Sequence, residues 1–210
     1  MSMGASSGLW MLDEPLILAS GSAARAEMLR GVGVPFHIDR PTLDERAVEA
    51  PLRATGSGGA QIAAALALAK ALEVSARHPG RYVLGGDQTL QVGADLLSKP
   101  EGRAGAKEHL RFLSGRSHQL HAAAVLARDG ETLLTLSDAA TLTMRSLSED
   151  FIETYLNAAG EAVLGSVGAY QIEGLGLHLF ERIEGQHPVI MGLPLKPLIE
   201  GLRKLHLLRG

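Results

Sequence analysis

The sequence contains no cysteine. This excludes disulfides, thiolate nucleophiles and cysteine-based zinc sites, and it fits a reducing compartment. Aromatic residues make up only 4% of the chain, too few for the base-stacking surfaces of proteins that bind single-stranded nucleic acid. The net charge is −3, so no overall positive field favours nucleic acid either. An anionic ligand would therefore need a local cluster of cations.

Signals for membranes and export are also lacking. No apolar run reaches the ~18 residues that span a bilayer. Residues 1–12 lack the basic region and the long apolar core of a signal peptide. We therefore expect a cytoplasmic protein that contacts neither membrane nor nucleic acid.

Apolar residues form 46% of the 210 positions, enough for a sizeable core. We expect residues 1–14 to form a flexible N-terminal extension and residues 15–210 to form one domain. Helix and strand patterns alternate in the first half, and strand patterns cluster in the middle. This order predicts an α/β fold with a mixed sheet.

Period-two patterns and short apolar runs predict the strands, and apolar spacing of three and four residues predicts the helices. The expected strands are 16–19, 36–39, 82–87, 119–127, 132–136 and 139–145, with a hairpin at 90–97 and a strand-rich segment at 169–184. The expected helices are 23–32, 60–78, 103–113, 147–159 and 195–207, with a loop or short helix in 42–59.

The most informative stretch is the transition from the first strand to the first helix. The strand ends at Ser20-Gly21-Ser22, and the helix that follows carries Arg25. Unpaired N–H groups and the helix dipole make such an N-terminus favourable for anions, and an arginine there can grip phosphate oxygens. An ordinary helix cap by Ser20 or Ser22, with a solvated Arg25, fits the same pattern equally well.

Four further polar residues lie near the expected ends of elements. Asp87 follows a buried strand and two glycines, the place where α/β sheets bind ligands. Lys70 lies within an apolar helix, where it either extends to solvent or points into a phosphate site. Glu45 and Lys99 taken alone resemble solvated loop residues. With Arg25, this set of carboxylates and cations suits Mg²⁺ or Mn²⁺, a polyphosphate and phosphoanhydride hydrolysis.

Other common catalytic motifs are not present. The sequence has no GxxxxGK[ST] loop, no GxGxxG following a strand and no HExxH. His118 and His121 lie in an expected strand and so face opposite sides of the sheet. We interpret them as structural residues rather than metal ligands.

From Leu16 to Leu207 the chain resembles the Maf (septum-formation-associated) family of nucleoside triphosphate pyrophosphatases. The resemblance rests on ordered blocks of matching sequence: 19–25, 44–45, 68–71, 85–88, 99–100, 114–118, 167–174, 180–185 and 191–195. It implies a long, mixed, twisted sheet with flanking helices and a central cleft, as in the inosine triphosphate pyrophosphatases. It also implies a metal-dependent house-cleaning enzyme, commonly a homodimer, that cleaves triphosphates into a monophosphate and pyrophosphate.

The resemblance assigns roles by position. Asp87 is the expected catalytic acid, and with Glu45 it would hold the Mg²⁺ or Mn²⁺ ion. The expected phosphate-binding residues are Ser20, Ser22, Arg25, Lys70 and Lys99. Gln88 and Glu173 are expected at the base.

Three positions bear on the substrate. Ala24 stands where the family has the first of two arginines. Gln88 and Glu173 replace the Thr and Gln of the branch that prefers dTTP and UTP, and resemble the branch acting on 7-methyl-GTP. A carboxylate at Glu173 can accept N–H bonds from a guanine edge.

Two alternatives stay open. One is a dTTP/UTP pyrophosphatase of the same family, and the other is a non-catalytic nucleotide-binding regulator of septation. The presence of Asp87, Lys70 and Lys99 favours an enzyme.

Overall fold

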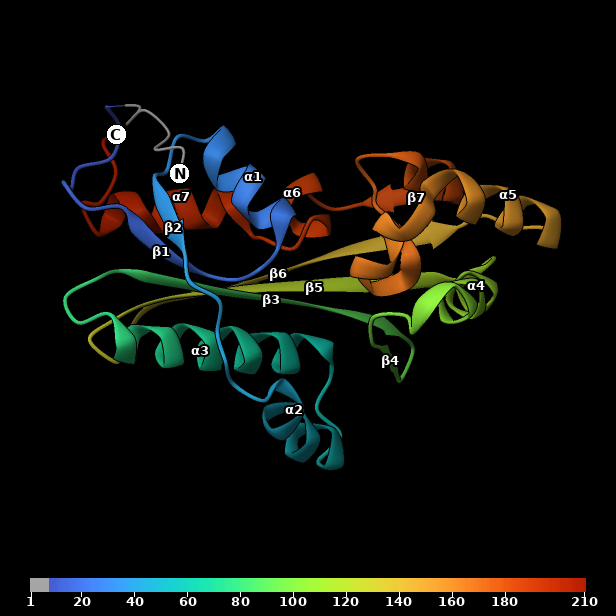
Figure 1. Ribbon diagram of the computed structural model, residues 1–210, viewed down its shortest axis with the longest axis horizontal. Coiled ribbons are helices and arrows are strands. Elements are labelled where there is room, and N and C mark those ends of the chain that lie inside the picture. Colours follow the sequence, from blue (N-terminus) through green and yellow to red (C-terminus); the bar gives the residue numbers. More distant parts are fainter. Residues whose placement is uncertain (1–7) are drawn as a thin grey trace.

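The computed structural model describes residues 8–210 and shows an α/β fold built on one mixed, twisted sheet (Figure 1). The strand order is β2-β1-β3-β5-β6-β7, with β4 paired to β3. The strands are β1 (Leu16–Ala19), β2 (Phe36–Ile38), β3 (Val83–Val92), β4 (Asp95–Leu97), β5 (Ser117–Arg128), β6 (Glu131–Met144) and β7 (Phe180–Glu184). The α/β class and the mixed sheet with flanking helices are thus confirmed.

Helices cover both faces of the sheet. They are α1 (Ala23–Gly31), α2 (Glu45–Ala54), α3 (Gly59–Arg77), α4 (Gly102–Leu113), α5 (Glu149–Ala159), α6 (His187–Ile190) and α7 (Leu195–Lys204), with 3-10 turns η1 (Gly160–Gly165), η2 (Val167–Ala169) and η3 (Leu175–Leu179). In Figure 1, α3 and α2 lie on one side of the sheet, and α1, α6 and α7 lie on the other.

The parallel part of the sheet is short. β1 pairs in parallel with both β2 and β3, and its last residue, Ala19, is opposite Gly85. β3 continues for seven more residues beyond that point, paired only with antiparallel strands. Side chains that follow Gly85 in β3 therefore lie beyond the end of β1.

Side chains of β3 alternate between the two faces, as a strand requires. Val83 packs against Val74 of α3, and Leu84 packs in the cluster that contains Leu29 of α1. A Cβ built on Gly85 would lie 2.3 Å from the carbonyl oxygen of Ala67. The absence of a side chain at Gly85 therefore lets α3 approach the sheet closely.

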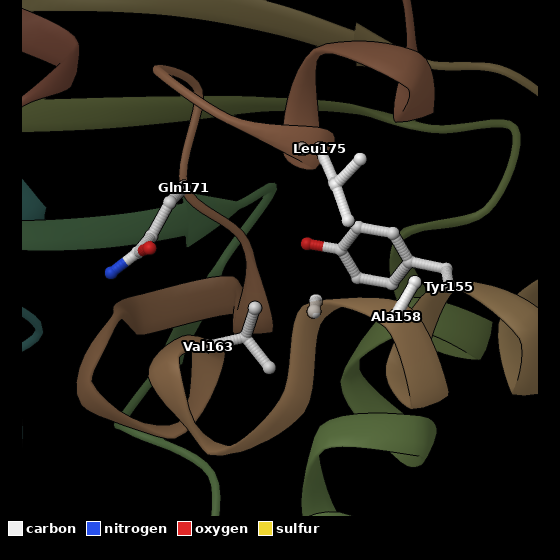
Figure 2. Close-up of a pocket in the computed structure, with 7 residues that line it drawn as sticks. Tyr155, Ala158, Val163, Gln171 and Leu175 are labelled. Atoms are coloured by element: carbon white, nitrogen blue, oxygen red, sulfur yellow. The ribbon is translucent and has the colours of Figure 1, made fainter.

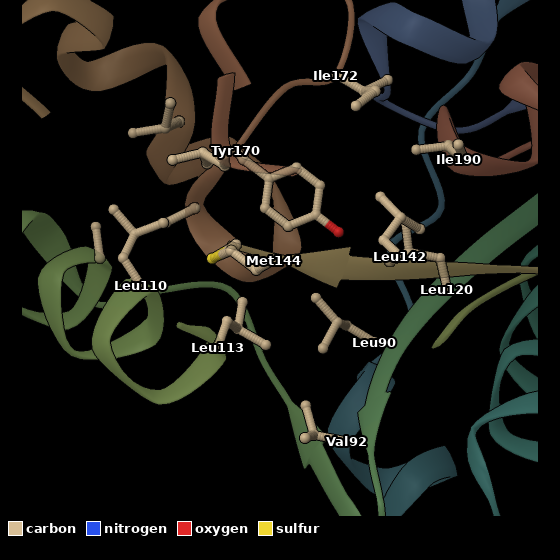
Figure 3. Close-up of a cluster of buried hydrophobic side chains, with 14 of the residues drawn as sticks. Leu90, Val92, Leu110, Leu113, Leu120, Leu142, Met144, Tyr170, Ile172 and Ile190 are labelled. Carbon is tan, nitrogen blue, oxygen red and sulfur yellow. The ribbon is translucent and has the colours of Figure 1, made fainter. Parts of the chain in front are cut away.

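The face opposite α3 carries two hydrophobic clusters. The first, which we call the α1–α7 cluster, includes Leu18, Leu84, Leu193 and Leu202. The second, the α4–α5 cluster, is shown in Figure 3 and gathers side chains from α4, the ends of β3, β5 and β6, and the 170–190 region. Met191 packs against both clusters, so the segment that follows α6 lies between them.

Some elements differ from the sequence prediction. The strand expected at 82–87 continues to Val92, and the strands expected at 132–136 and 139–145 are one strand, β6. The prediction of a strand-rich 169–184 was wrong for 169–179, which contains 3-10 turns and other turns, and only β7, at 180–184, is a strand. Gly168 and Ala169 adopt positive φ angles of 81° and 60°, which a strand does not permit.

The part of the expected N-terminal extension that is described does not project from the domain. Residues 1–7 lie outside the described residues. Trp10 is only 7% exposed and forms an antiparallel bridge with Leu208, while the amide of Met11 donates to Leu207. Burial of the indole thus holds this segment against the C-terminal residues.

Helix α3 passes one test for a membrane-spanning helix. By length and composition alone, α3 is apolar enough to cross a bilayer. The search of the sequence for long apolar runs did not identify this helix. Half of its apolar window is buried inside the protein, and its alanines Ala63, Ala67 and Ala71 pack against β5. These contacts are those of a core helix.

Replacing Gly85 by alanine tests the close approach of α3. The added methyl would overlap the backbone of Ala67, so Gly85→Ala should lower the free energy of unfolding by about 1–3 kcal/mol or more. Gly31→Ala is the matched control, because a Cβ at Gly31 meets no atom within 4 Å. Chemical denaturation measures both variants, and equal stabilities would contradict the packing described.

Candidate active site

Asp87 and Lys70 form the centre of a buried polar cluster. Lys70, on α3, donates a hydrogen bond of 2.6 Å from Nζ to Oδ1 of Asp87. Both residues are 7% exposed. The sequence placed Asp87 at the carboxyl end of a strand, but it lies in mid-strand, opposite Ala123 of β5. Asp87 nevertheless lies beyond the end of β1, because β3 extends further than this parallel neighbour.

Glu45 extends the cluster to the surface. Its Oε1 lies 2.9 Å from Nζ of Lys70, and its side chain is 52% exposed. Asp44 caps α2 by accepting bonds from the amides of Arg46 and Ala47, so the helix starts at Glu45. Lys70 does not extend to solvent: its ammonium group is buried between two carboxylates, and its contact with phosphate stays a prediction.

Arg25 approaches the cluster from the other face of the sheet. Its guanidinium is buried, donating from Nη1 to Oγ of Ser20 at 3.0 Å and from Nε to the carbonyl of Gly192 at 2.7 Å. Ser22 is the N-cap of α1, and its Oγ accepts from the amide of Arg25 at 3.3 Å. The helix cap expected from the sequence is thus present, but Arg25 is buried rather than solvated.

Charge and burial oppose each other in this cluster. Burial raises the pKa of the Asp87 carboxyl above its ordinary value, and the positive charges of Lys70 and Arg25 partly reverse the effect. Burial lowers the pKa of Arg25, and Asp87 and Glu45 act in the opposite direction. Two carboxylates and two cations therefore compensate one another at the point where β1 ends.

The carboxylates of Glu45 and Asp87 suit a hard divalent ion whose remaining ligands come from the substrate. Within residues 8–210, no three His, Cys, Asp or Glu side chains gather as a metal site. Glu45 and Asp87 instead share one partner, Lys70. Mg²⁺ in phosphate-transferring sites is commonly held by one or two carboxylates together with phosphate oxygens. These two carboxylates could supply that part of the coordination.

Gln88 faces away from Asp87, as the next residue of a strand must. Its Nε2 donates to the carbonyls of Val189, at 3.0 Å, and Ile190, at 2.8 Å. The sequence placed Gln88 at the base, but both its amide protons bind the last turn of α6. Only Oε1 remains as an acceptor for other groups.

Lys99 and Glu173 are not brought into the cluster. Both are exposed, Lys99 after β4 and Glu173 in the turn between η2 and η3. Neither forms a hydrogen bond or ion pair with any residue in the described part of the chain. Their assignments to phosphate and base stay predictions.

A hollow of about 180 Å³ adjoins the turn that carries Glu173. Tyr155 and Ala158 of α5, Val163 of η1, Gln171 and Leu175 are among the residues that line it (Figure 2). None of the residues expected at the site lines this hollow.

Sequence reasoning missed two neighbours of the cluster. The carbonyl of Gly192 accepts a hydrogen bond from Arg25. A Cβ built on Gly21 would lie 3.2 Å from Nε of Arg40, so the Arg40 side chain lies beside Gly21. The block 191–195 was noticed only as part of a resemblance, and Arg40 gave no signal beyond its place after a strand. The predicted opposite orientation of the two histidines is confirmed: His118 binds Tyr170 in the core, and His121 faces Gly59 of α3.

Replacing Lys70 by methionine should make stability fall as pH rises. The change leaves Asp87 buried without its nearest cation, so its folded-state pKa moves further above the unfolded value. A raised carboxyl pKa gives stability that is present below the unfolded pKa and is lost as pH rises through the folded pKa. We expect a loss of about 3 kcal/mol at pH 8 and a smaller loss at pH 5.

Denaturant unfolding of Lys70→Met at several pH values measures this effect. Lys196→Met is the control, because Lys196 makes an exposed ion pair with Glu200 that is worth less than about 1 kcal/mol. A loss at pH 5 equal to that at pH 8 would mean that Asp87 does not depend on Lys70.

Comparison with known proteins identifies the family. Residues 15–205 match the family described as Maf-like protein. A protein of Nitrobacter winogradskyi named nucleoside triphosphate pyrophosphatase is 54% identical over 200 residues, which cover 95% of this chain and 98% of the relative. Proteins named 7-methyl-GTP pyrophosphatase are 49% identical in Mesorhizobium japonicum and 46% in Brucella abortus, covering 95% and 90% of this chain and 100% and 95% of those relatives. The chain belongs to the Maf family.

Proposed function

We propose that this protein hydrolyses nucleoside triphosphates between the α- and β-phosphates, yielding a nucleoside monophosphate and pyrophosphate. The observation that carries the proposal is the pair of ion pairs Glu45–Lys70 and Lys70–Asp87, in which Lys70 and Asp87 are buried, with Arg25 beside them. Relatives that match nearly the whole chain are named for this activity. A buried carboxylate beside two cations provides both a proton acceptor and compensation for phosphate charge.

Each residue has a defined task in the proposed reaction. The amides at the start of α1 and the hydroxyls of Ser20 and Ser22 bind phosphate oxygens, and Arg25 neutralises their charge. Asp87 orients the attacking water and accepts its proton. Lys70 already touches Asp87 and holds its carboxylate in place. A Mg²⁺ or Mn²⁺ ion held by Glu45 and Asp87 would supply further charge neutralisation when bound.

The base is proposed to be guanine-like. Glu173 is exposed and has no partner in the described residues, so its side chain is available to a ligand, and a carboxylate offers only hydrogen-bond acceptors. Guanine presents two adjacent donors, whereas uracil and thymine place one N–H between two carbonyls. Relatives named 7-methyl-GTP pyrophosphatase agree with this choice.

Two other readings are distinguished by direct assay. A dTTP/UTP pyrophosphatase would prefer pyrimidines, and a non-catalytic regulator of septation would bind nucleotides without releasing pyrophosphate.

Lys99 is proposed to reach the phosphates when substrate binds. A homodimer in the cytoplasm is proposed on the strength of the family resemblance.

Asp87→Asn should lower turnover by at least about 100-fold, because the amide cannot accept the proton of water or ligate a metal well. Chromatography of the reaction should show monophosphate and pyrophosphate with the unmodified protein. Asp95→Asn, on the exposed strand β4, serves as the control. Near-normal turnover of folded Asp87→Asn, or release of diphosphate and orthophosphate, would refute the assignment.

The base preference is tested with Glu173→Gln. The unmodified protein should show a higher kcat/KM for 7-methyl-GTP or another guanine-type triphosphate than for UTP and dTTP, by about ten- to hundred-fold. Glu173→Gln should narrow this gap, because an amide can also donate a bond. Glu181→Gln, on the exposed strand β7, should leave the gap unchanged. Preference of the unmodified protein for UTP or dTTP would overturn the proposal.

A further inference from the structure

The segment 187–193 joins the two clusters on the face of the sheet opposite α3. Val189 and Ile190 belong to the α4–α5 cluster, whereas Leu193 belongs to the α1–α7 cluster. Its helix, α6, has only four residues, and the amides from Val189 to Leu193 donate to carbonyls of residues 186–189 in the same stretch of chain. These bonds shape the segment internally, whereas its position against the sheet depends on groups outside it.

Gln88 supplies such groups from the middle of β3. Its Nε2 has two protons, and they go to the carbonyls of Val189 and Ile190. The carbonyl of Ile190 receives no other hydrogen bond in the described part of the chain, and that of Val189 otherwise receives only the amide of Gly192. Gln88 thus ties the last turn of α6 to the strand that carries Asp87.

The same segment holds Arg25. The carbonyl of Gly192 accepts from Nε of Arg25 at 2.7 Å, and Gly192 has a φ of +94°, a conformation that favours glycine. A Cβ on Gly192 would lie 3.2 Å from Nη2 of Arg25 and 3.5 Å from Oε1 of Gln88. On the other side, a Cβ on Gly86 would lie 3.1 Å from Nε of Arg25. The guanidinium therefore lies between two glycine backbones, one in β3 and one in the segment that Gln88 holds.

We infer that Gln88 is a positioning residue that acts through this segment: it fixes the Gly192 carbonyl, which orients Arg25 toward the phosphates. The inference rests on the proposed function, because Arg25 is a phosphate-binding residue only there. The expected contact between Gln88 and the base stays a prediction, and the two roles differ in what they affect. A positioning residue of this kind affects all triphosphates equally, whereas a base-reading residue changes the preference among them.

Gln88→Met tests the inference, because it removes both donors while nearly keeping side-chain volume and charge. Loss of bonds that fix a buried, charged partner should lower kcat/KM about tenfold for guanine-type substrates and for UTP alike. In an Arg25→Ala background the same change should have less than about a twofold effect, because the two residues act as one unit. Gln119→Met, at an exposed glutamine of the neighbouring strand β5, should change nothing.

A second measurement does not depend on activity. NMR should show the Nε–H proton of Arg25 exchanging at least about tenfold faster in Gln88→Met than in the unmodified protein, with faster exchange of the amides in 187–193. Unchanged exchange at Arg25, additive effects of the two substitutions, or an altered base preference would each overturn the inference. Absence of pyrophosphate release from the unmodified protein would instead refute the proposed function, and the exchange measurement would still decide the role of Gln88.

Discussion

The buried ion pair between Lys70 and Asp87 is the interaction on which the rest of the site depends. A charge taken out of water is costly unless a partner is held at short range, and losing either partner costs more than the pair contributes. The pair forms because α3 lies close enough to β3 for Lys70 to reach the strand, and Gly85 makes that approach possible. Core packing and site chemistry therefore depend on the same helix position.

The end of β1 determines where the charged groups can meet. Up to Gly85, this edge of β3 is paired with β1, and from Gly86 to Thr89 it is paired with no strand of the described chain before β4 pairs with Leu90–Val92. Arg25 comes from the helix that follows β1, and Asp87 lies two residues beyond the last parallel pair. Groups from opposite faces of the sheet consequently influence each other at this edge.

Much of this arrangement could be predicted from local sequence patterns. The helix at 60–78, the strands expected at 119–127 and 132–136 and the grouping of Arg25, Lys70 and Asp87 follow from apolar periodicity and charge. The position of Asp87 was misjudged, because two glycines before an aspartate resemble a turn. In the structure they are needed for the close passage of α3 and Arg25.

Other features depend on contacts that a local pattern does not contain. Apolar residues of 169–179 pack into the core from irregular turns, and their spacing imitates a strand. The partners of Gln88 are backbone carbonyls about a hundred positions away, and no side-chain type marks them. Lys99 and Glu173 were placed by resemblance alone, and their exposed side chains leave their partners undetermined by packing.

The bridge between Trp10 and Leu208 holds the first described residues against the C-terminal end of the chain. Figure 1 shows the start of the described chain and the C-terminus close together at one end of the sheet. Chains with adjacent ends tolerate being joined there and opened elsewhere, provided that the new opening lies in an exposed turn. The turn at Asp129-Gly130, between β5 and β6, meets that condition. A circular permutant opened there would keep β3, α1 and α3 in one unbroken stretch of chain, and with them every contact among Arg25, Lys70 and Asp87.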